Sequence, residues 1–245
     1  GQFNIDVNDF DLAMLEPIFA VMGVEAQSKG KLTASLKTDF EKSTLKKVSG
    51  TIKANALEID AKKLFENKIK TDQLDVKVQA QIDKNIINIS QLEITTDFCR
   101  VSAKGAIPKT LGSLDELMKS KGQLKGFIEC DLAAAANQFP QLLNMKQETK
   151  ITSGQLNAKA DTFTENGQRK LIANATISNL AGQMQNKSFT LSEDIKLDAK
   201  ISADKGTTYI DNLSVQASFC DLNLSGTPKK LLYNLQTDIT KLNSE

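Results

Sequence analysis

The 245-residue chain contains no histidine and no tryptophan, and aromatic residues make up only 5% of it. Without histidine, general acid–base chemistry near neutral pH would fall to carboxylates or lysines. The carboxylates Asp75, Asp83 and Asp198 stand at alternate polar positions of predicted strands, where acidic side chains normally face solvent. Nucleophile-elbow and phosphate-loop patterns are absent from the sequence. We therefore expect a protein that is not an enzyme, with no catalytic residue and no cofactor.

Cysteine is scarce, with Cys99, Cys130 and Cys220 as its three occurrences. Their spacing is too wide for a metal knuckle, and an odd number argues against a disulfide framework. We expect three small buried hydrophobic residues and no metal site, because free cysteine is commonly buried. A redox pair of Cys99 and Cys220 is the alternative, and it would need two distant parts of the chain to fold onto each other.

Charge of one sign and long hydrophobic runs are also missing. The 31 basic and 30 acidic residues are interspersed. The sequence therefore has no basic stripe that could bind a phosphate backbone, and no nucleic-acid partner is expected. No run approaches the ~18 apolar residues of a membrane-spanning helix. The first residue is glycine rather than methionine, and we expect any membrane contact to be made through flanking segments absent from this sequence.

The chain repeats one pattern at an offset of about 121 residues. Matching segments are Asp83-Lys84 with Asp204-Lys205, Phe98-Cys99 with Phe219-Cys220, Gly105 with Gly226, and Asp11-Leu12-Ala13 with Asp131-Leu132-Ala133. A long internal repeat is typical of modular arrays. It predicts one unit over residues 2–122, a second over 123–230, and the start of a third over 231–245. Each full unit is expected to contain a strand, a helix and about five further strands, next to other repeats of the same parent chain.

Strict alternation of apolar and polar residues runs through Leu74–Asp83 and Ile195–Ala203. This period of two predicts strands of an antiparallel sheet with one apolar face and one solvated face. The parity slips at Phe98-Cys99 and at Phe219-Cys220, which predicts a β-bulge or a very tight turn and a sharp curl of the sheet at both places.

One helix per unit is predicted, over residues 12–22 and 132–143, with Asp11 and Asp131 as N-caps. Pro17 and Pro140 are expected to kink or break these helices. One helix cannot cover about six strands. The uncovered apolar face, rich in alanine, must pack against a second sheet, against itself or against a ligand.

Four segments carry a resemblance to a known family: Ile89–Ile94 with Val101–Gly105, and Ile210–Val215 with Leu222–Gly226, together with the unit starts Gly30-Lys31-Leu32 and Gly154-Gln155-Leu156. This arrangement resembles the AsmA-like proteins of bacterial envelopes, relatives of TamB and YhdP, which belong to the repeating β-groove, bridge-like lipid-transfer proteins. The resemblance implies a mainly β fold with a minor helix per repeat, in which tandem repeats of curved antiparallel sheet form an elongated open groove, or β-taco.

The resemblance further implies a protein of the periplasm or cell envelope of a Gram-negative-type bacterium, anchored through a segment absent here. Its groove would shield the acyl chains of phospholipid or another acyl lipid during transport between envelope membranes. The alternative is a non-enzymatic structural or adhesive β-repeat scaffold with a closed core and no lipid. The residues expected to line the groove are Leu74, Val76, Val78, Ala80, Ile82, Leu92, Ile94, Val101, Ala103, Ile195, Leu197, Ala199, Ile201, Leu213, Val215, Leu222 and Leu224.

Overall fold

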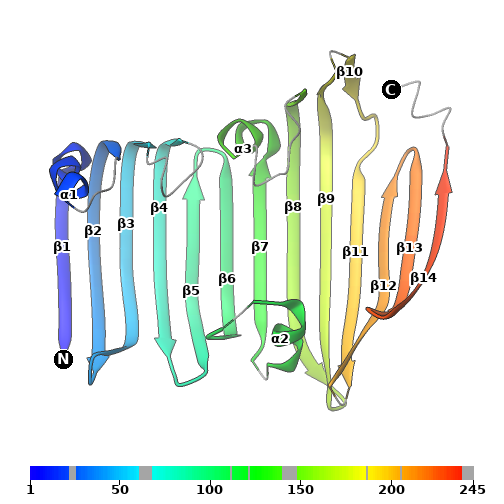
Figure 1. Cartoon of the computed structure of the whole chain (residues 1–245), viewed down its shortest axis with the longest axis horizontal. Helices are drawn as coiled ribbons and strands as arrows, with labels where there is room; N and C mark the ends of the chain where they lie inside the picture. The colour runs from blue at the N-terminus through cyan, green and yellow to red at the C-terminus, as the bar shows by residue number, and fades with distance from the viewer. Residues whose placement is uncertain are drawn as a thin grey trace.

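The computed structural model describes residues 1–21, 26–60, 68–110, 112–120, 122–139, 148–185, 187–204 and 206–238. These residues form one long antiparallel sheet of 14 strands (Figure 1). The strands are β1 Gln2–Asp11, β2 Gln27–Glu41, β3 Thr44–Asp60, β4 Ile69–Ile82, β5 Ile86–Thr96, β6 Cys99–Pro108, β7 Leu124–Asp131, β8 Thr149–Glu165, β9 Gln168–Met184, β10 Lys187–Thr190, β11 Ile195–Asp204, β12 Thr207–Ala217, β13 Cys220–Thr227 and β14 Lys230–Thr237.

The sheet follows the order of the chain, because each strand pairs with the next one except at β10, which folds back onto β9 so that β9 also pairs with β11. Within the described residues β1 and β14 lie at opposite ends and do not pair, so the sheet is not closed. The predicted fold class is therefore confirmed at the level of a mainly β protein built on one open antiparallel sheet.

The period-two pattern predicts strands at the right places: Leu74–Asp83 falls on β4, Ile69–Ile82, and Ile195–Ala203 falls on β11, Ile195–Asp204. The short strand β10 was not predicted, since four residues carry too little alternation to be distinguished from a loop. The parity slips are tight turns: β5 ends at Thr96 and β6 begins at Cys99, and β12 and β13 are joined in the same way. The chain reverses at these two places, so the tight-turn alternative is confirmed and the bulge alternative is wrong there; the curl of the sheet at these residues stays a prediction.

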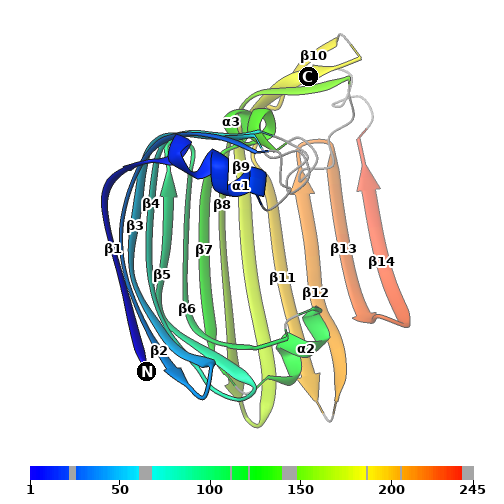
Figure 2. The ribbon, with the colours of Figure 1, turned by 60° about the vertical axis from the view of Figure 1, so that its left-hand side comes forward.

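Register irregularities occur instead inside the strand pairs that precede these turns. They lie between Gln79 and Ala80 and between Ile89 and Leu92, and in the second half between Lys200 and Ile201 and between Ile210 and Leu213. Extra residues of this kind increase local twist and bend a strand. Figure 2 shows the resulting curvature, with the helices on the inner side of the sheet.

The first predicted helix is present as a 3-10 helix η1, Leu12–Leu15, followed by α1, Glu16–Val21, with Met22 outside the described residues. The change of helix type falls directly before Pro17, where proline, which lacks an N–H, is tolerated in the first α-helical turn. The carboxylate of Asp11 accepts a hydrogen bond from the N–H of Ala13 at 3.0 Å, as expected of an N-cap.

The second predicted helix is α3, Leu132–Gln138, capped by Asp131; residues 140–143 lie outside the described part of the chain. A further helix, α2, Leu114–Lys119, was not predicted. Ser113 caps it by accepting the N–H of Glu116 at 3.2 Å, and this Ser-x-x-Glu spacing is a capping signal that the sequence carried.

Cys99 and Cys130 form a disulfide between β6 and β7, with their Cα atoms 4.2 Å apart. The prediction of free cysteines is therefore wrong for this pair, and so is the alternative pairing of Cys99 with Cys220. Sequence spacing could not reveal the bond, because it depends on the register that places Cys99 opposite Cys130. Cys220 is free and half-buried.

Candidate functional site: the concave face of the sheet

The strand register aligns apolar side chains into continuous rows along the inner face. One of them, here called the central row, crosses all thirteen strands of the main path. Its members are Val7, Ala34, Ile52, Val76, Ile94, Val101, Ile128, Ala158, Ala175, Leu197, Val215, Leu222 and Leu235. No polar residue interrupts it. Since strands lie about 4.8 Å apart, the twelve spacings give the row a length of about 58 Å.

A second row lies two residues further along each strand and is also apolar throughout. It runs through Ile5, Leu36, Gly50, Val78, Leu92, Ala103, Gly126, Ala160, Ala173, Ala199, Leu213, Leu224 and Tyr233. On five adjacent strands, β6 to β9 and β11, it contains only alanine or glycine. We call these five residues the small-residue floor: Ala103, Gly126, Ala160, Ala173 and Ala199.

The register places all seventeen predicted lining residues on this same face. Most stand in the two rows above, Leu74 and Ile195 lie in the row toward α3, and Ala80 and Ile201 lie in the row toward the opposite end. Ile82 pairs with Ile87 at the end of β4. Ala80, Ala199 and Ile201 are buried and the others are half-buried. That these residues contact lipid stays a prediction.

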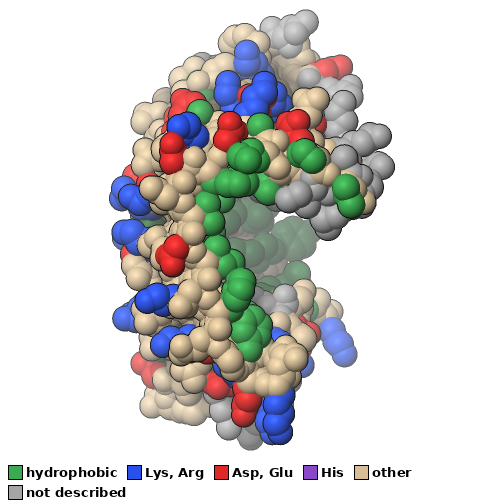
Figure 3. Space-filling model, turned by 90° about the vertical axis from the view of Figure 1, so that its left-hand side faces the viewer, with side chains coloured by type: hydrophobic (Ala, Val, Ile, Leu, Met, Phe, Trp, Pro, Cys, Tyr) green, Lys and Arg blue, Asp and Glu red, His purple; other side chains and the backbone are tan. Residues whose placement is uncertain are grey.

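The inner face is hollowed. Figure 3 views the molecule from the β1 side and shows hydrophobic side chains gathered in the hollow, with charged side chains around the outside. Helical segments cover the two ends of the strands: Leu12 of η1 packs with Ala54 and Leu57 at one end, and Met118 of α2 packs with Leu171 and Ile201 at the other. Apolar residues between these clusters remain partly open to solvent, as the 40% exposure of Ile128 illustrates.

An apolar cavity of about 360 Å³ lies where α3 meets the sheet. Leu74 and Leu156 contribute from the strands, Leu132 and Ala135 contribute from α3, and the disulfide forms part of the wall. The rings of Phe98 and Phe139 stand 6.3 Å apart beside it. A cavity lined in this way suits a hydrocarbon rather than a polar ligand.

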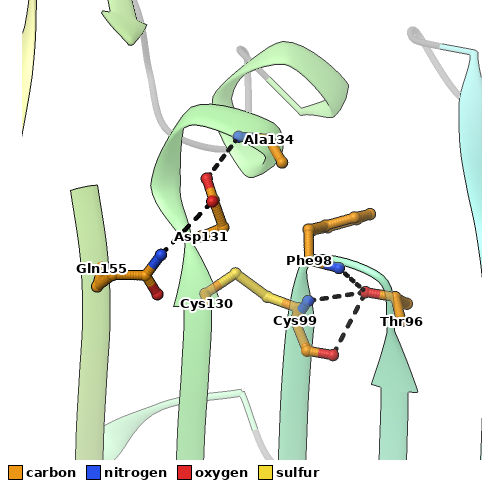
Figure 4. The surroundings of a disulfide bond; sticks show 7 residues. All are labelled: Thr96, Phe98, Cys99, Cys130, Asp131, Ala134 and Gln155. Atoms are coloured by element: carbon orange, nitrogen blue, oxygen red, sulfur yellow. Dashed lines mark hydrogen bonds between the residues drawn. A yellow bond between two sulfur atoms is a disulfide. The ribbon is translucent and has the colours of Figure 1, made fainter. Parts of the chain in front are cut away.

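Local hydrogen bonds fix the cavity wall (Figure 4). The hydroxyl of Thr96 accepts the N–H of Cys99 at 2.9 Å and that of Phe98 at 3.3 Å, which holds the β5–β6 turn. The carboxylate of Asp131 accepts the N–H of Ala134 at 3.0 Å and so orients α3 over the sheet. The disulfide thus lies between the β5–β6 turn, which Thr96 holds, and α3, which Asp131 caps.

Arg169 of β9 lies at the opposite end of the inner face, at the same parity as Leu171 and Ala173. Its side chain is buried, with the residue 6% exposed. Nη2 donates to the hydroxyl of Thr162 at 2.7 Å and to the carbonyl of Gly122. Nε is buried and has no hydrogen-bond partner among the described residues. Burial lowers the pKa of the Arg169 guanidinium, against a smaller opposing effect of the Asp161 carboxylate.

The outer face carries mixed charges in cross-strand ion pairs. The Lys77 ammonium lies 3.4 Å from Glu93, and Lys125 lies 3.4 Å from Asp161. Hydrogen bonding to Gln91, and then to Lys77, lowers the pKa of Glu93. Exposed pairs of this kind contribute little to stability. They give the outer face a solvated surface with both signs of charge.

Neither a metal-binding group of three acidic, histidine or cysteine side chains nor a helix long and apolar enough to cross a membrane occurs in the described residues. Comparison of the chain with known protein families, curated proteins and solved structures finds no match. Sequence reasoning missed Arg169, although a cation at an inward position of an alternating strand was a readable signal.

Proposed function

We propose that this chain is a lipid-binding and lipid-transfer module whose concave face is an elongated open groove that shields acyl chains. The observation that carries the proposal is the unbroken central row, which crosses thirteen strands without a polar side chain and has no second sheet over it in the described residues. A soluble protein rarely leaves so long an apolar strip uncovered unless something binds there.

The magnitude of the hydrophobic effect supports a hydrocarbon ligand. Removing one methylene from water is worth about 0.8 kcal/mol. Burial of most of a sixteen-carbon chain is then worth on the order of 10 kcal/mol before the costs of association are subtracted. The alanines of the small-residue floor leave width for such a chain, which bulkier residues would fill.

Recurring local features support a division into repeats at 2–122 and 123–230, with a third unit beginning at 231. Gly105 and Gly226 both adopt positive φ, at 132° and 122°. The N–H of Asp131 donates to the carbonyl of Phe98 at 2.8 Å, and the N–H of Asp238 donates to that of Phe219 at 2.9 Å. The two halves therefore share these local backbone features as well as their residues. A parent chain with further repeats would lengthen the groove in the same register.

The disulfide supports an envelope location for the proposed transfer. Structural disulfides persist in oxidising compartments such as the bacterial periplasm and are rare in the cytosol. In that setting the groove would carry phospholipid or another acyl lipid between envelope membranes, and flanking segments would provide the membrane attachment.

A closed scaffold without lipid is the competing function. It requires the apolar face to be covered by a second layer, whereas the described residues form a single sheet with helices at its ends. The half-buried state of Val76 and Leu197 also argues against a closed core, since core positions are normally fully buried.

Native mass spectrometry of the purified protein, followed by organic extraction, tests the proposal. We expect co-purifying acyl lipid at one molecule or more per unit. The variants Val76→Asp and Leu197→Asp should keep β-sheet circular dichroism and lose lipid, because an open groove tolerates a charge that a closed core does not. Gln79→Asp, which adds the same charge on the outer face, is the matched control. Lipid-free protein that unfolds on either inner substitution would establish the closed scaffold instead.

A further inference from the structure

Arg169 is a buried cation without a counter-ion. Among the described residues no carboxylate lies within ion-pair distance of its guanidinium; the nearest acid to influence it, Asp161, stands on the outer face and pairs with Lys125 at 3.4 Å. Arginine stays protonated in proteins. Burying a charge without a partner is costly, so this position calls for an anion that the described residues do not supply.

The guanidinium is directed toward the small-residue floor. Arg169 pairs across the sheet with Thr164, yet Nη2 reaches the hydroxyl of Thr162 at 2.7 Å, one inward position closer to the floor. Ala160, the next inward residue of β8, is exposed to the hollow. Nε has no partner among the described residues. One inward row separates Arg169 from the floor residues Ala160 and Ala173: it holds Thr162 and Leu171, and Leu171 packs on Met118 of α2.

We propose that the floor and Arg169 form a binding site for an acidic amphiphile, with the acyl chain over the alanines and an oxyanion head group, carboxylate or phosphate, on the guanidinium. This inference rests on the proposed lipid-binding function and specifies its ligand class. An oxyanion head group would neutralise the buried charge by accepting a charge-assisted hydrogen bond from the guanidinium. The hydroxyl of Thr162 holds the guanidinium in place for that contact.

Isothermal titration of delipidated protein with oleate and with oleamide, below their aggregation concentrations, tests the site. The two ligands share one hydrocarbon chain and differ in head-group charge. We expect wild type to bind oleate at least about tenfold more tightly, the value of one hydrogen bond to a charged group. Arg169→Gln should remove this preference and leave oleamide binding unchanged. Lys125→Gln, which removes a cation from the outer face nearby, should retain it.

Each other outcome has a distinct meaning. Equal binding of oleate and oleamide by wild type would overturn the Arg169 site and leave the groove standing. Absence of binding by both would overturn the groove and the site together. Displacement of oleate by an equal concentration of inorganic phosphate would assign Arg169 to free anions rather than to lipid head groups. If circular dichroism shows that Arg169→Gln does not fold, the ratio of oleate to oleamide affinity in wild type decides whether the site exists. Arg169→Lys should then keep part of the preference for oleate.

Discussion

Two strand pairs of this molecule have the same register and different surroundings. At the first, β6 meets β7 and Cys99 stands opposite Cys130; at the second, β13 meets β14 and Cys220 stands opposite Thr237. A backbone hydrogen bond of nearly equal length closes both ladders. The first junction is covalently linked and covered by α3, whereas every residue of β14 is exposed.

The difference shows that strand register and burial have separate origins. Turn residues and cross-strand pairing are local and recur wherever the pattern recurs. The burial of Cys130 in β7 comes from elements that follow it, namely β8 and α3, and β14 is the last strand of the described sheet. Equivalent positions of the two strand pairs can therefore be compared directly, because they differ in the elements that surround them.

Removing the disulfide should have the largest effect. Replacing Cys99 and Cys130 by serine releases a link across 31 residues, for which the chain-entropy relation gives roughly 3–4 kcal/mol of lost stability. Urea unfolding followed by circular dichroism measures this loss. Cys220→Ser, the control at the equivalent place, should change stability by under about 0.5 kcal/mol. Equal losses in the two variants would contradict the difference between the junctions.

Introducing the missing cysteine should make the second junction like the first. Thr237→Cys places a thiol opposite Cys220 in the register that Cys130 has with Cys99. We expect a spontaneous second disulfide that stabilises the protein by about 2–3 kcal/mol. Peptide mapping without reductant and thermal melting provide the readouts. Two thiols that remain reactive in folded, air-oxidised protein would show that β14 does not hold this register.

Replacing the equivalent glycines Gly105 and Gly226 by alanine should destabilise the two strand pairs to different extents, with a smaller effect than the cysteine changes. A Cβ on Gly105 would lie 1.9 Å from the carbonyl oxygen of Gln123, and one on Gly226 would lie 2.3 Å from that of Lys230. Both residues also have positive φ, so each substitution introduces strain. We expect Gly105→Ala to cost about 2–3 kcal/mol and Gly226→Ala about half of that, because the edge strand can move away. A larger loss of stability for Gly226→Ala than for Gly105→Ala, in the same unfolding assay, would contradict an edge strand that can move away.

The smallest effect is expected on β14 itself. Tyr233 is 74% exposed, and Tyr233→Ser should change the free energy of unfolding by under about 0.5 kcal/mol. Analytical ultracentrifugation of the same variant should show less self-association, since it removes a hydrophobic side chain from an unprotected sheet edge. A loss of stability above about 1 kcal/mol would indicate that something covers this strand.

Much of the sheet was readable from the sequence because its signals are local. Alternation fixed the inner face, so that residues as distant as Val76 and Leu197 were assigned to one side, and Asp11 and Asp131 marked the helix starts. Register-dependent features were not readable. The Cys99–Cys130 bond needs the pairing of β6 with β7, and the burial of Arg169 needs α2 and the segment after it to reach across to β9.

The side-by-side arrangement of the strands also has a mechanical consequence. Tension between the ends of the chain would act first on β1 and β14. It would break their inter-strand hydrogen bonds one after another, so that strands would peel from the edges of the sheet inward. The bond between Cys99 and Cys130 stops that peeling at the middle of the sheet. Under load, residues 99–130 form a loop that cannot extend until the disulfide is reduced.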